Sequence, residues 1–243
     1  MTAWWQGTLA TLDTETTGTD VENDRTVTAV LDVYESTDTC TESLHLLLDP
    51  GIEIPAEAEA VHGISTQHAR DQGTDPVTGL TALLAAIVGV WDRQIPLVVY
   101  NAAFDLTLID REFRRHLDTP LVLAGPVIDP MVIDRHVDRY VKGTGQRQLG
   151  PTCARYGIDV TDWHTAEADA YAAQAVARRM GEKHDAQMPS TLQDLWRWQV
   201  GLRRDHAADL QNYFARVGKT NDDGTPIIID GQWPMLAREA PRA

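Results

Sequence analysis

The chain has 243 residues, of which 43% are hydrophobic and 23% are charged, a balance that is ordinary for a globular protein with a substantial core. No apolar run is long enough to cross a bilayer, and the N-terminus lacks the basic start of a signal peptide. We therefore expect a cytoplasmic protein with no membrane partner. The formal net charge of −15 predicts that any binding to nucleic acid is weak, salt-sensitive and non-processive unless a partner supplies affinity.

Cysteine usage points to an intracellular, reduced protein. The two cysteines, Cys40 and Cys153, lie far apart in the sequence and have no C-x-x-C spacing. A disulfide framework or a zinc site is therefore not expected.

Three strands are predicted in the first part of the chain, because β-branched and aliphatic residues are concentrated in three short segments. These segments are residues 9–13, 26–34 and 43–48. Asn23-Asp24 predicts a turn between the first two. Short links between successive strands indicate an antiparallel meander.

From residue 55 onward, helical periodicity alternates with two short apolar runs that read as buried strands. The strands are predicted at 97–100 and 127–128, and the helices at 76–91, around 106–117, at 148–156 and at 165–180. Glycines follow the last two helices, at Gly157 and Gly181, as is common after a helix. We expect an α/β fold: a mixed sheet with flanking helices to about residue 182.

The remainder, residues 183–243, is predicted to be a C-terminal helical extension and tail outside a catalytic unit at 1–182. The polar segment 182–189 resembles a linker, and Ser190 with Gln193 forms a capping-box pattern before a long helix to about Val217. An apolar run at 227–229 predicts a strand. Trp196 and Trp198 cannot share one side of that helix, so we expect at least one to be partly exposed and available to the core, a second chain or a partner.

Four acidic residues and a histidine carry the strongest chemical signal. Asp13 and Glu15 are two apart on a predicted strand, so their side chains leave the same face, where two carboxylates are costly without a cation. Asp105 and Asp169 fall near the starts of two predicted helices, and we place His164 in the loop before the second. Carboxylate ligands without thiolates suit Mg²⁺ or Mn²⁺.

Each of these signals has an ordinary structural explanation when it is taken alone. Acids are common near helix N-termini, and a single histidine is more often solvated or packed than catalytic. The conjunction of D-x-E-T-T-G, N-A-x-F-D and H-x-A-x-x-D in this order is far less expected by chance. We interpret the set as a two-metal phosphodiesterase site.

In these motifs the chain resembles the DEDDh family of 3′–5′ exonucleases, which is similar to polymerase proofreading subunits and belongs to the ribonuclease H-like superfamily. All five motif positions match, and V-H-G-I-S at 61–65 resembles a V-H-G-I-T segment of that family. One departure is Tyr100, where many relatives have histidine. Tyr100 is not a ligand position.

The resemblance implies a five-stranded mixed sheet and two bound divalent cations, Mg²⁺ or Mn²⁺. Asp13 would touch both ions, and Glu15, Asp105 and Asp169 would complete their ligands. His164 would act as general base for attack on the phosphorus. The implied reaction releases nucleoside 5′-monophosphates from a 3′ end of DNA, single-stranded or frayed.

Substrate contacts are predicted beside the first motif. Thr16, Thr17 and Gly18 would meet the terminal nucleotide through backbone groups, with His62 and Phe104 as further candidates. For His62 and Phe104, packing in the core or in a loop is an equally good interpretation.

Two other functions stay open on the sequence alone. An exoribonuclease or oligonucleotide-trimming enzyme of the same superfamily would differ in contacts to the 2′ position of the sugar, which the sequence does not expose. A polymerase-associated proofreading or binding module is a third candidate. Its polymerase would be a separate polypeptide, and residues 183–243 offer a surface for it or for self-association.

Overall fold

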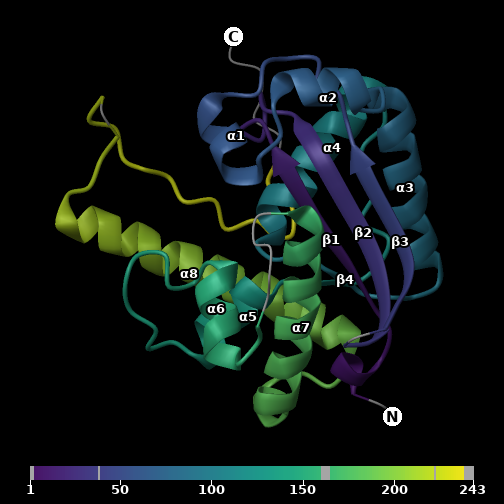
Figure 1. Ribbon diagram of the computed structural model, residues 1–243. Helices are drawn as coiled ribbons and strands as arrows, with labels where there is room; N and C mark the ends of the chain where they lie inside the picture. The colour runs from purple at the N-terminus through teal and green to yellow at the C-terminus, as the bar shows by residue number, and fades with distance from the viewer. Residues whose placement is uncertain (1–2, 38, 160–164, 222, 238–243) are drawn as a thin grey trace.

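A five-stranded mixed sheet lies at the centre of the molecule, with helices on both faces (Figure 1). The computed structural model describes residues 3–37, 39–159, 165–221 and 223–237. Its strands are β1 (Leu9–Thr16), β2 (Thr26–Ser36), β3 (Thr39–Leu47), β4 (Leu97–Val98) and β5 (Val127–Ile128). Their order across the sheet is β3-β2-β1-β4-β5. The predicted α/β fold is confirmed.

The strands pair as an antiparallel meander extended by two parallel strands. β1 pairs antiparallel with β2, and β2 with β3, as predicted. β4 lies parallel to β1 on one side and to β5 on the other. The carboxyl ends of β1, β4 and β5 therefore meet at one edge of the sheet, and the segments that follow these strands are neighbours there.

Helices occupy most of the chain after β3. They are α1 (Ala56–His62), α2 (Thr66–Gln72), α3 (Pro76–Asp92), α4 (Ala102–Leu117), α5 (Pro130–Val137), α6 (Leu149–Tyr156), α7 (Ala166–His184) and α8 (Leu192–Val217), with 3-10 turns at η1 (Trp4–Gln6) and η2 (Asp185–Gln187). No helix in the described part of the chain is both long and apolar enough to span a bilayer.

Alternating side chains on β1 divide the core into two layers. Ala10 and Leu12 join the cluster packed against α3 and α4, whereas Leu9 joins the cluster built with α5, α6 and α7. Because side chains alternate along a strand, Asp13 and Glu15 share the face of Leu9. The sheet therefore presents both carboxylates on the side that α7 covers.

The prediction that Gly181 follows α7 is wrong. This glycine lies inside the helix, which continues to His184. A Cβ at Gly181 would come within 2.4 Å of the Trp5 indole, so the glycine allows this ring to lie against the helix. Gly157 does follow α6, with a left-handed φ of 67°. Close packing and helix termination thus account for two glycines that look alike in sequence.

The region after α7 differs from the prediction in three details. The segment expected as a linker contains the end of α7 and the turn η2. The N-cap of α8 is Thr191, whose hydroxyl accepts a hydrogen bond from the Asp194 backbone N–H at 3.1 Å, so the cap lies one residue after Ser190. Residues 227–229 form no strand, because the Gln211 side-chain amide bonds their backbone instead, donating to the Ile227 carbonyl and accepting from the Ile229 N–H.

The C-terminal extension packs directly against the sheet. The buried Gln199 side chain of α8 accepts a hydrogen bond from the Asp129 N–H at 2.7 Å and donates to the Val127 carbonyl at 3.0 Å. It therefore covers the free edge of β5 in the way that a further strand would. β3, at the opposite end of the sheet order, has no further strand beside it in the described part of the chain, and only its end is bridged, where the Thr74 N–H donates to the Leu47 carbonyl at 2.8 Å. An independent unit at 1–182 stays a prediction.

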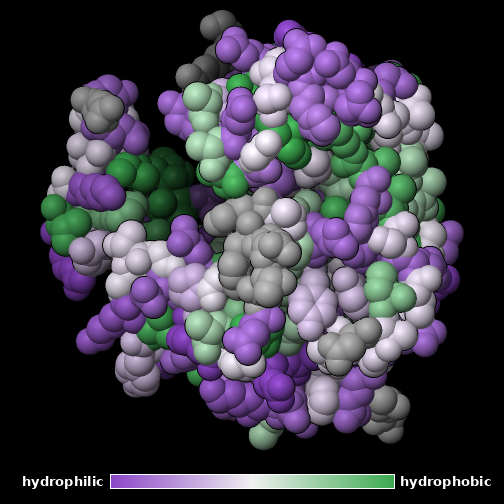
Figure 2. Space-filling view, in the orientation of Figure 1, coloured by the Kyte–Doolittle hydropathy of each residue, from purple (hydrophilic) through white to green (hydrophobic). Residues whose placement is uncertain are grey.

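Trp196 and Trp198 face different sides of α8, as expected. Trp196 meets the buried Trp233 edge-on, with ring centroids 5.2 Å apart, and Trp198 meets His136 at 5.1 Å. Trp198 therefore attaches the extension to α5 of the body, whereas Trp196 contacts a ring of the extension itself. Beyond them, α8 and the segment after it project as an arm (Figure 1). A hollow separates this arm from the body, and apolar side chains gather on the arm (Figure 2).

Candidate active site

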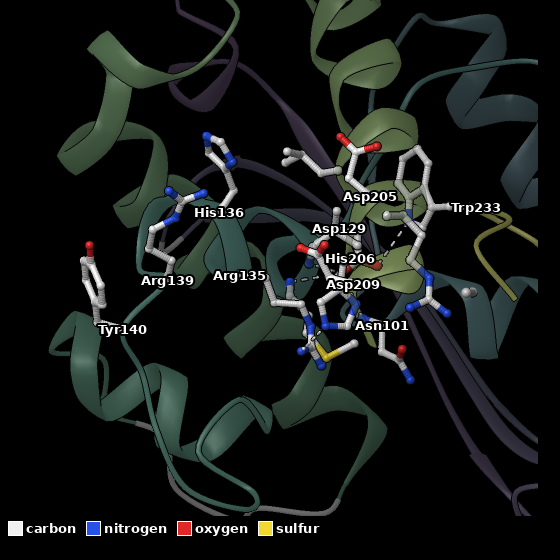
Figure 3. Close-up of a pocket in the computed structure, with 15 residues that line it drawn as sticks. Asn101, Asp129, Arg135, His136, Arg139, Tyr140, Asp205, His206, Asp209 and Trp233 are labelled. Carbon is white, nitrogen blue, oxygen red and sulfur yellow. Dashed lines mark hydrogen bonds between the residues drawn. The ribbon is translucent and has the colours of Figure 1, made fainter. Parts of the chain in front are cut away.

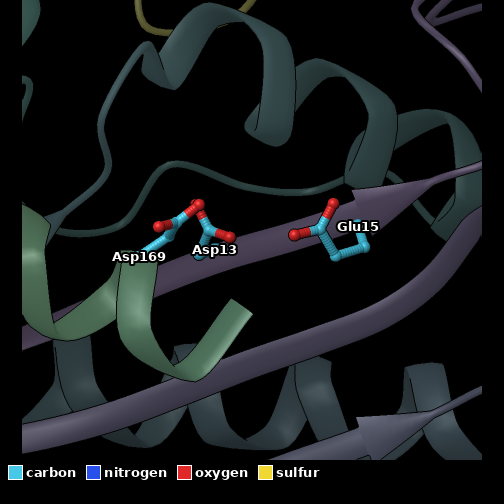
Figure 4. A group of neighbouring side chains, drawn as sticks. All are labelled: Asp13, Glu15 and Asp169. Carbon is cyan, nitrogen blue, oxygen red and sulfur yellow. The ribbon is translucent and has the colours of Figure 1, made fainter. Parts of the chain in front are cut away.

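Three of the predicted ligands converge in space. Carboxylate oxygens of Asp13, Glu15 and Asp169 all lie within 4.8 Å of one another. Asp13 and Glu15 come from β1, and Asp169 comes from the first turn of α7 (Figure 4). We call these three residues the acidic cluster. The strand spacing alone fixes the first two, whereas the third depends on how α7 crosses the sheet.

Small residues bring α7 close enough for this contact. Ala166 and Ala170, on the buried side of the helix, pack with Val30 of β2. The Thr165 hydroxyl caps the helix by accepting a hydrogen bond from the Ala168 N–H at 3.2 Å. Alanine side chains keep the helix axis near the strands, so a short aspartate can reach the β1 carboxylates.

Asp105 approaches from the other face of the sheet. It lies in the first turn of α4, and its buried carboxylate accepts a 2.7 Å hydrogen bond from the Thr14 hydroxyl. Thr14 alternates with Asp13 and Glu15 and so points to the α4 side. The structure places Asp105 next to the acidic cluster without making it one of the three clustered ligands, although its charge contributes to the raised pKa of Asp13.

The electrostatics of the site favour a bound cation. Burial, followed by repulsion from Asp105, Asp169 and Glu15, raises the pKa of Asp13 well above its usual value. Burial and the same neighbouring aspartates raise the pKa of Glu15 to about 7. Burial raises the pKa of Asp105 to about 7, against the opposing effect of the Thr14 hydrogen bond. Protons or a divalent cation can relieve this repulsion, and oxygen-only ligands suit hard cations.

The predicted substrate residues near β1 share a cavity with Glu15. This cavity of about 510 Å³ is lined by Thr16, Thr17, Gly18 and His62, among others. The His62 Nδ1 accepts a hydrogen bond from the Ile64 N–H, and its Nε2 is buried without a partner among the described residues. Phe104 is half-buried at the start of α4 and is not among the residues that line this cavity.

Gly18 has a structural reason of its own. A Cβ there would lie 2.5 to 2.9 Å from the Asp24 carboxylate, which also accepts a 2.7 Å hydrogen bond from the Thr17 hydroxyl. The bare backbone expected to admit a substrate is therefore already required for the turn that follows β1. The predicted base, His164, lies outside the described residues.

Sequence reasoning missed Asp129, which organises the sheet edge beside the site. Its buried carboxylate accepts hydrogen bonds from five donors. They are the N–H groups of Asn101, Ala102, Met131 and Val132 and the Trp233 indole, at 3.0 to 3.4 Å. It thereby caps α4 and α5 together and holds Asn101 in its left-handed conformation, with φ 66°. Asp129-Pro130 is a recognisable helix start, but nothing local reveals the other contacts.

Comparison with known proteins gives a family match over most of the chain. A model of the exonuclease family, RNase T type, matches residues 11–177. The DNA polymerase III subunit epsilon of Rickettsia conorii is 25% identical over 151 residues, which are 61% of this chain and 61% of that protein. The chain thus matches less than two thirds of the length of this relative.

Solved structures share the fold at low sequence identity. Exonuclease I of Methylocaldum szegediense is 22% identical, with a TM-score of 0.60, over 85% of this chain and 46% of that chain. Exonuclease I of E. coli in complex with a dT13 oligonucleotide is 22% identical, with a TM-score of 0.61, over 75% and 42%. Exonuclease X in complex with 5′ overhanging duplex DNA is 18% identical, with a TM-score of 0.57, over 79% and 99%.

Proposed function

Because the chain belongs to the exonuclease family, we propose that it is a metal-dependent 3′–5′ exonuclease acting on DNA. It would hydrolyse the phosphodiester bond at a single-stranded or frayed 3′ end and release nucleoside 5′-monophosphates. The observation that carries this proposal is the convergence of Asp13, Glu15 and Asp169 within 4.8 Å. Family membership supports nuclease chemistry, and the direction of digestion is our inference from the five-residue motif.

The three clustered carboxylates fit a divalent cation, and we propose two. Asp13, Glu15 and Asp169 would hold them, with Asp105 beside them, and no thiolate competes for Mg²⁺ or Mn²⁺. When bound, the cations would neutralise charge on the scissile phosphate and on the leaving oxygen. Burial, and after it repulsion from the neighbouring carboxylates, raises the pKa of Asp13 and Glu15; a bound cation would offset both effects, so cation binding should stabilise the fold.

The chain's own groups would orient the substrate and move the proton. His164 would accept the proton of the attacking water, a role that requires neutral imidazole. The cavity lined by Thr16, Thr17 and His62 adjoins Glu15 and would hold the terminal nucleotide. The Thr14 hydroxyl would keep the Asp105 carboxylate in place through its 2.7 Å hydrogen bond.

DNA is proposed as the substrate because the similar proteins act with DNA or were solved bound to it. The curated relative is a DNA polymerase subunit, and exonuclease I and exonuclease X were solved with DNA bound. A polymerase partner is not proposed, since Trp196 and Trp198, the exposed candidates on the extension, contact Trp233 and His136 of this chain.

The test is a digestion of single-stranded DNA, duplex DNA and RNA, each labelled at the 5′ end, with Mg²⁺, Mn²⁺ or EDTA. We expect a ladder shortened from the 3′ end on single-stranded DNA with either cation and no digestion in EDTA. Preferential digestion of RNA would replace the proposed substrate with the exoribonuclease alternative. Undiminished digestion in EDTA would contradict the metal mechanism.

A further inference from the structure

A second recess lies at the N-terminus of α4, the helix that carries Asp105, and concentrates positive charge. Two adjoining cavities of about 630 and 610 Å³ share Asn101, Met131 and Arg135 in their walls. Six basic side chains line them, and we call this set the basic trough: Arg135, His136, Arg139, Arg147, Arg203 and His206. Arg135 and His206 lie together, while His136, Arg139 and Tyr140 continue to one side (Figure 3). Such a concentration is unexpected in a chain of net charge −15.

Two of these arginines, both half-buried, have no carboxylate partner within ion-pair distance in the described part of the chain, and the exposed Arg139 has none either. Arg135 donates to the His206 Nε2 at 3.0 Å, and Arg203 donates to the Asp230 carbonyl at 2.9 Å. Arg147 differs, because it pairs with Asp134 at 2.5 Å. Burial and the charges of Arg147 and Arg203 lower the pKa of Arg135. Unpaired guanidinium groups held close together are costly unless an anion joins them.

Unused donors point in the same direction. Burial and the neighbouring arginines lower the pKa of His206 to about 4, so this ring is neutral at pH 7. Because Nε2 accepts from Arg135, the hydrogen lies on Nδ1. That Nδ1 and the Arg203 Nε are both buried without a hydrogen-bond partner among the described residues. The walls of the trough therefore hold two buried donors that no protein acceptor satisfies.

The acidic residues in the same walls do not cancel this charge. The Asp129 carboxylate is already surrounded by five N–H donors. Asp205 is 71% exposed and pairs with Arg204 at 3.3 Å, and Asp209 is exposed to solvent. The carboxylates thus lie in saturated or solvated positions, while the guanidinium groups of Arg135 and Arg203 are left for a ligand.

The rim of the trough adds an aromatic platform. Tyr140 is 82% exposed, a high value for so large a side chain, and the exposed Arg139 precedes it. Arginines that neutralise phosphates and exposed rings that stack on bases are the combination by which proteins bind single-stranded nucleic acid. An isolated phosphate or a small anion would make no use of the ring.

The trough also lies at the edge of the sheet where the carboxyl ends of β1, β4 and β5 meet. Asn101 and Ala103, at the start of α4, line it, and Asp105 is two residues further along the same helix. The trough and the acidic cluster are therefore built on the adjoining ends of β1, β4 and β5. A strand whose end lies at the cluster can continue across the α4 N-terminus into the trough.

We propose that the basic trough binds the phosphodiester backbone of single-stranded nucleic acid upstream of a 3′ end held at the acidic cluster. The direction of the strand rests on the proposed exonuclease function; binding of the backbone to the trough does not. The net negative charge of the chain opposes binding of nucleic acid. The trough would provide local affinity for it, mainly through the two half-buried, unpaired arginines.

Binding measured without catalysis tests this directly. The full chain in EDTA is titrated against a fluorescent oligothymidylate of about 12 nucleotides, followed by anisotropy at several salt concentrations. Arg135→Gln with Arg203→Gln should weaken binding about tenfold or more and lower the salt slope by about 1.4, the value for two phosphates on a single strand. A dinucleotide, which has a single bridging phosphate to neutralise, should be affected less. Arg197→Gln, on the same helix but 67% exposed, is the matched control and should bind like wild type.

A second pair of variants guards against misfolding of the half-buried arginines. Tyr140→Ala and Arg139→Gln alter exposed side chains, and each should weaken binding of the oligonucleotide roughly threefold to tenfold. Wild-type affinity in both the double arginine variant and these two would overturn the proposal. Competition by polyglutamate as effective as by the oligonucleotide would also overturn it, in favour of an acidic peptide. Since no hydrolysis is measured, an inactive enzyme that still binds through the trough would refute only the exonuclease function.

Discussion

Asp129 and the acidic cluster lie at the same edge of the sheet and solve the burial of carboxylates in opposite ways. Asp129 follows β5 and accepts hydrogen bonds from five N–H donors, four of them from the first turns of α4 and α5 and their flanks. Asp13, Glu15 and Asp169 face one another instead. The N–H donors offset part of the burial that raises the pKa of Asp129, whereas the neighbours of Asp13 and Glu15 add to the effect of burial on their pKa values.

The difference separates a carboxylate that organises the fold from carboxylates that we propose hold cations. A buried carboxylate with its donors in place stabilises the fold and has no lone pair to spare. Carboxylates that repel one another can still bind a cation, and the cation then stabilises their ionised form where protein groups do not. The saturation of a buried acid by donors, more than its depth, indicates its role.

The largest effect should come from breaking the cluster. Asp13→Asn removes a ligand but keeps the shape of the side chain, so turnover in Mg²⁺ should fall by about 10³-fold or more. The melting temperature in EDTA should stay the same or rise, because one repelling charge is lost. Initial rates and thermal melts of both proteins check this. A variant with near-wild-type turnover would show that the site is elsewhere.

Within the site, His164→Ala and Asp169→Ala should separate a base from a ligand. His164→Ala should lower the rate by about 10²–10⁴-fold and keep wild-type metal affinity. Asp169→Ala should weaken metal binding, because its oxygen lies within 4.8 Å of those of Asp13 and Glu15. Calorimetric metal titration alongside a pH–rate profile distinguishes the two. Equal loss of metal affinity in both variants would make His164 a ligand.

Asp129→Ala should do the reverse of Asp13→Asn and destabilise the fold. The N–H groups of Asn101, Ala102 and the Trp233 indole would lose their acceptor in a buried place, at a cost of about 3 kcal/mol or more in the free energy of unfolding. The melting temperature should fall by roughly 6–12 °C, with or without Mg²⁺. Asp92→Ala, at an exposed aspartate, is the control and should change stability by less than about 0.5 kcal/mol.

The stability of the protein should depend on pH because the pKa values of two carboxyl groups are raised in the folded state. The pKa values of Glu15 and Asp105 are raised to about 7 in the folded protein, so the folded state binds protons more tightly than the unfolded state does. Their contribution is complete below the unfolded pKa, near 4, and is lost as the pH rises through about 7. In EDTA the melting temperature should therefore fall by roughly 5 °C between about pH 5 and pH 8.

Mg²⁺ should reverse this trend, since it favours the ionised carboxylates. Glu15→Gln should flatten the EDTA profile. A wild-type profile in EDTA that rises over the same interval would mean that the cluster is not repulsive.

The smallest effect concerns the neighbour of Asp129. Gln199→Leu leaves the Asp129 N–H and the Val127 carbonyl without their partner, which should cost about 1–3 kcal/mol in the free energy of unfolding. Gln193→Leu, at an exposed position of the same helix, is the matched control. Urea denaturation of the two variants measures the difference, and equal midpoints would show that the side-chain bonds to β5 contribute nothing.

The parts of the molecule that depend on local pattern could be predicted from the sequence. The spacing of Asp13 and Glu15 on a strand predicts that they share one face of the sheet, and helical periodicity predicts α3 and α8 over nearly their full lengths. What failed depends on contacts between distant segments. Gly181 looks like a helix terminator until Trp5, from the other end of the chain, is placed against it.

The contacts that organise the site edge are of the same kind. The Asp129 carboxylate accepts a hydrogen bond from the Trp233 indole, although the two residues are 104 positions apart in the sequence. The basic residues of the trough are likewise spread over α5, α8 and the loop after α5. None of these pairs leaves a periodic or local signal.

The Gln199 side chain has a consequence for assembly. An open sheet edge is a template on which another polypeptide can add a strand, and proteins commonly obstruct such edges. Here the amide of Gln199 occupies the hydrogen-bonding groups of Val127 and Asp129, so a visiting strand could pair with β5 only by displacing α8. β3 is the other outermost strand. Growth of the sheet by a second chain, whether in a specific complex or in aggregation, is therefore directed to the part of β3 before the Thr74 bridge and away from the edge beside the acidic cluster.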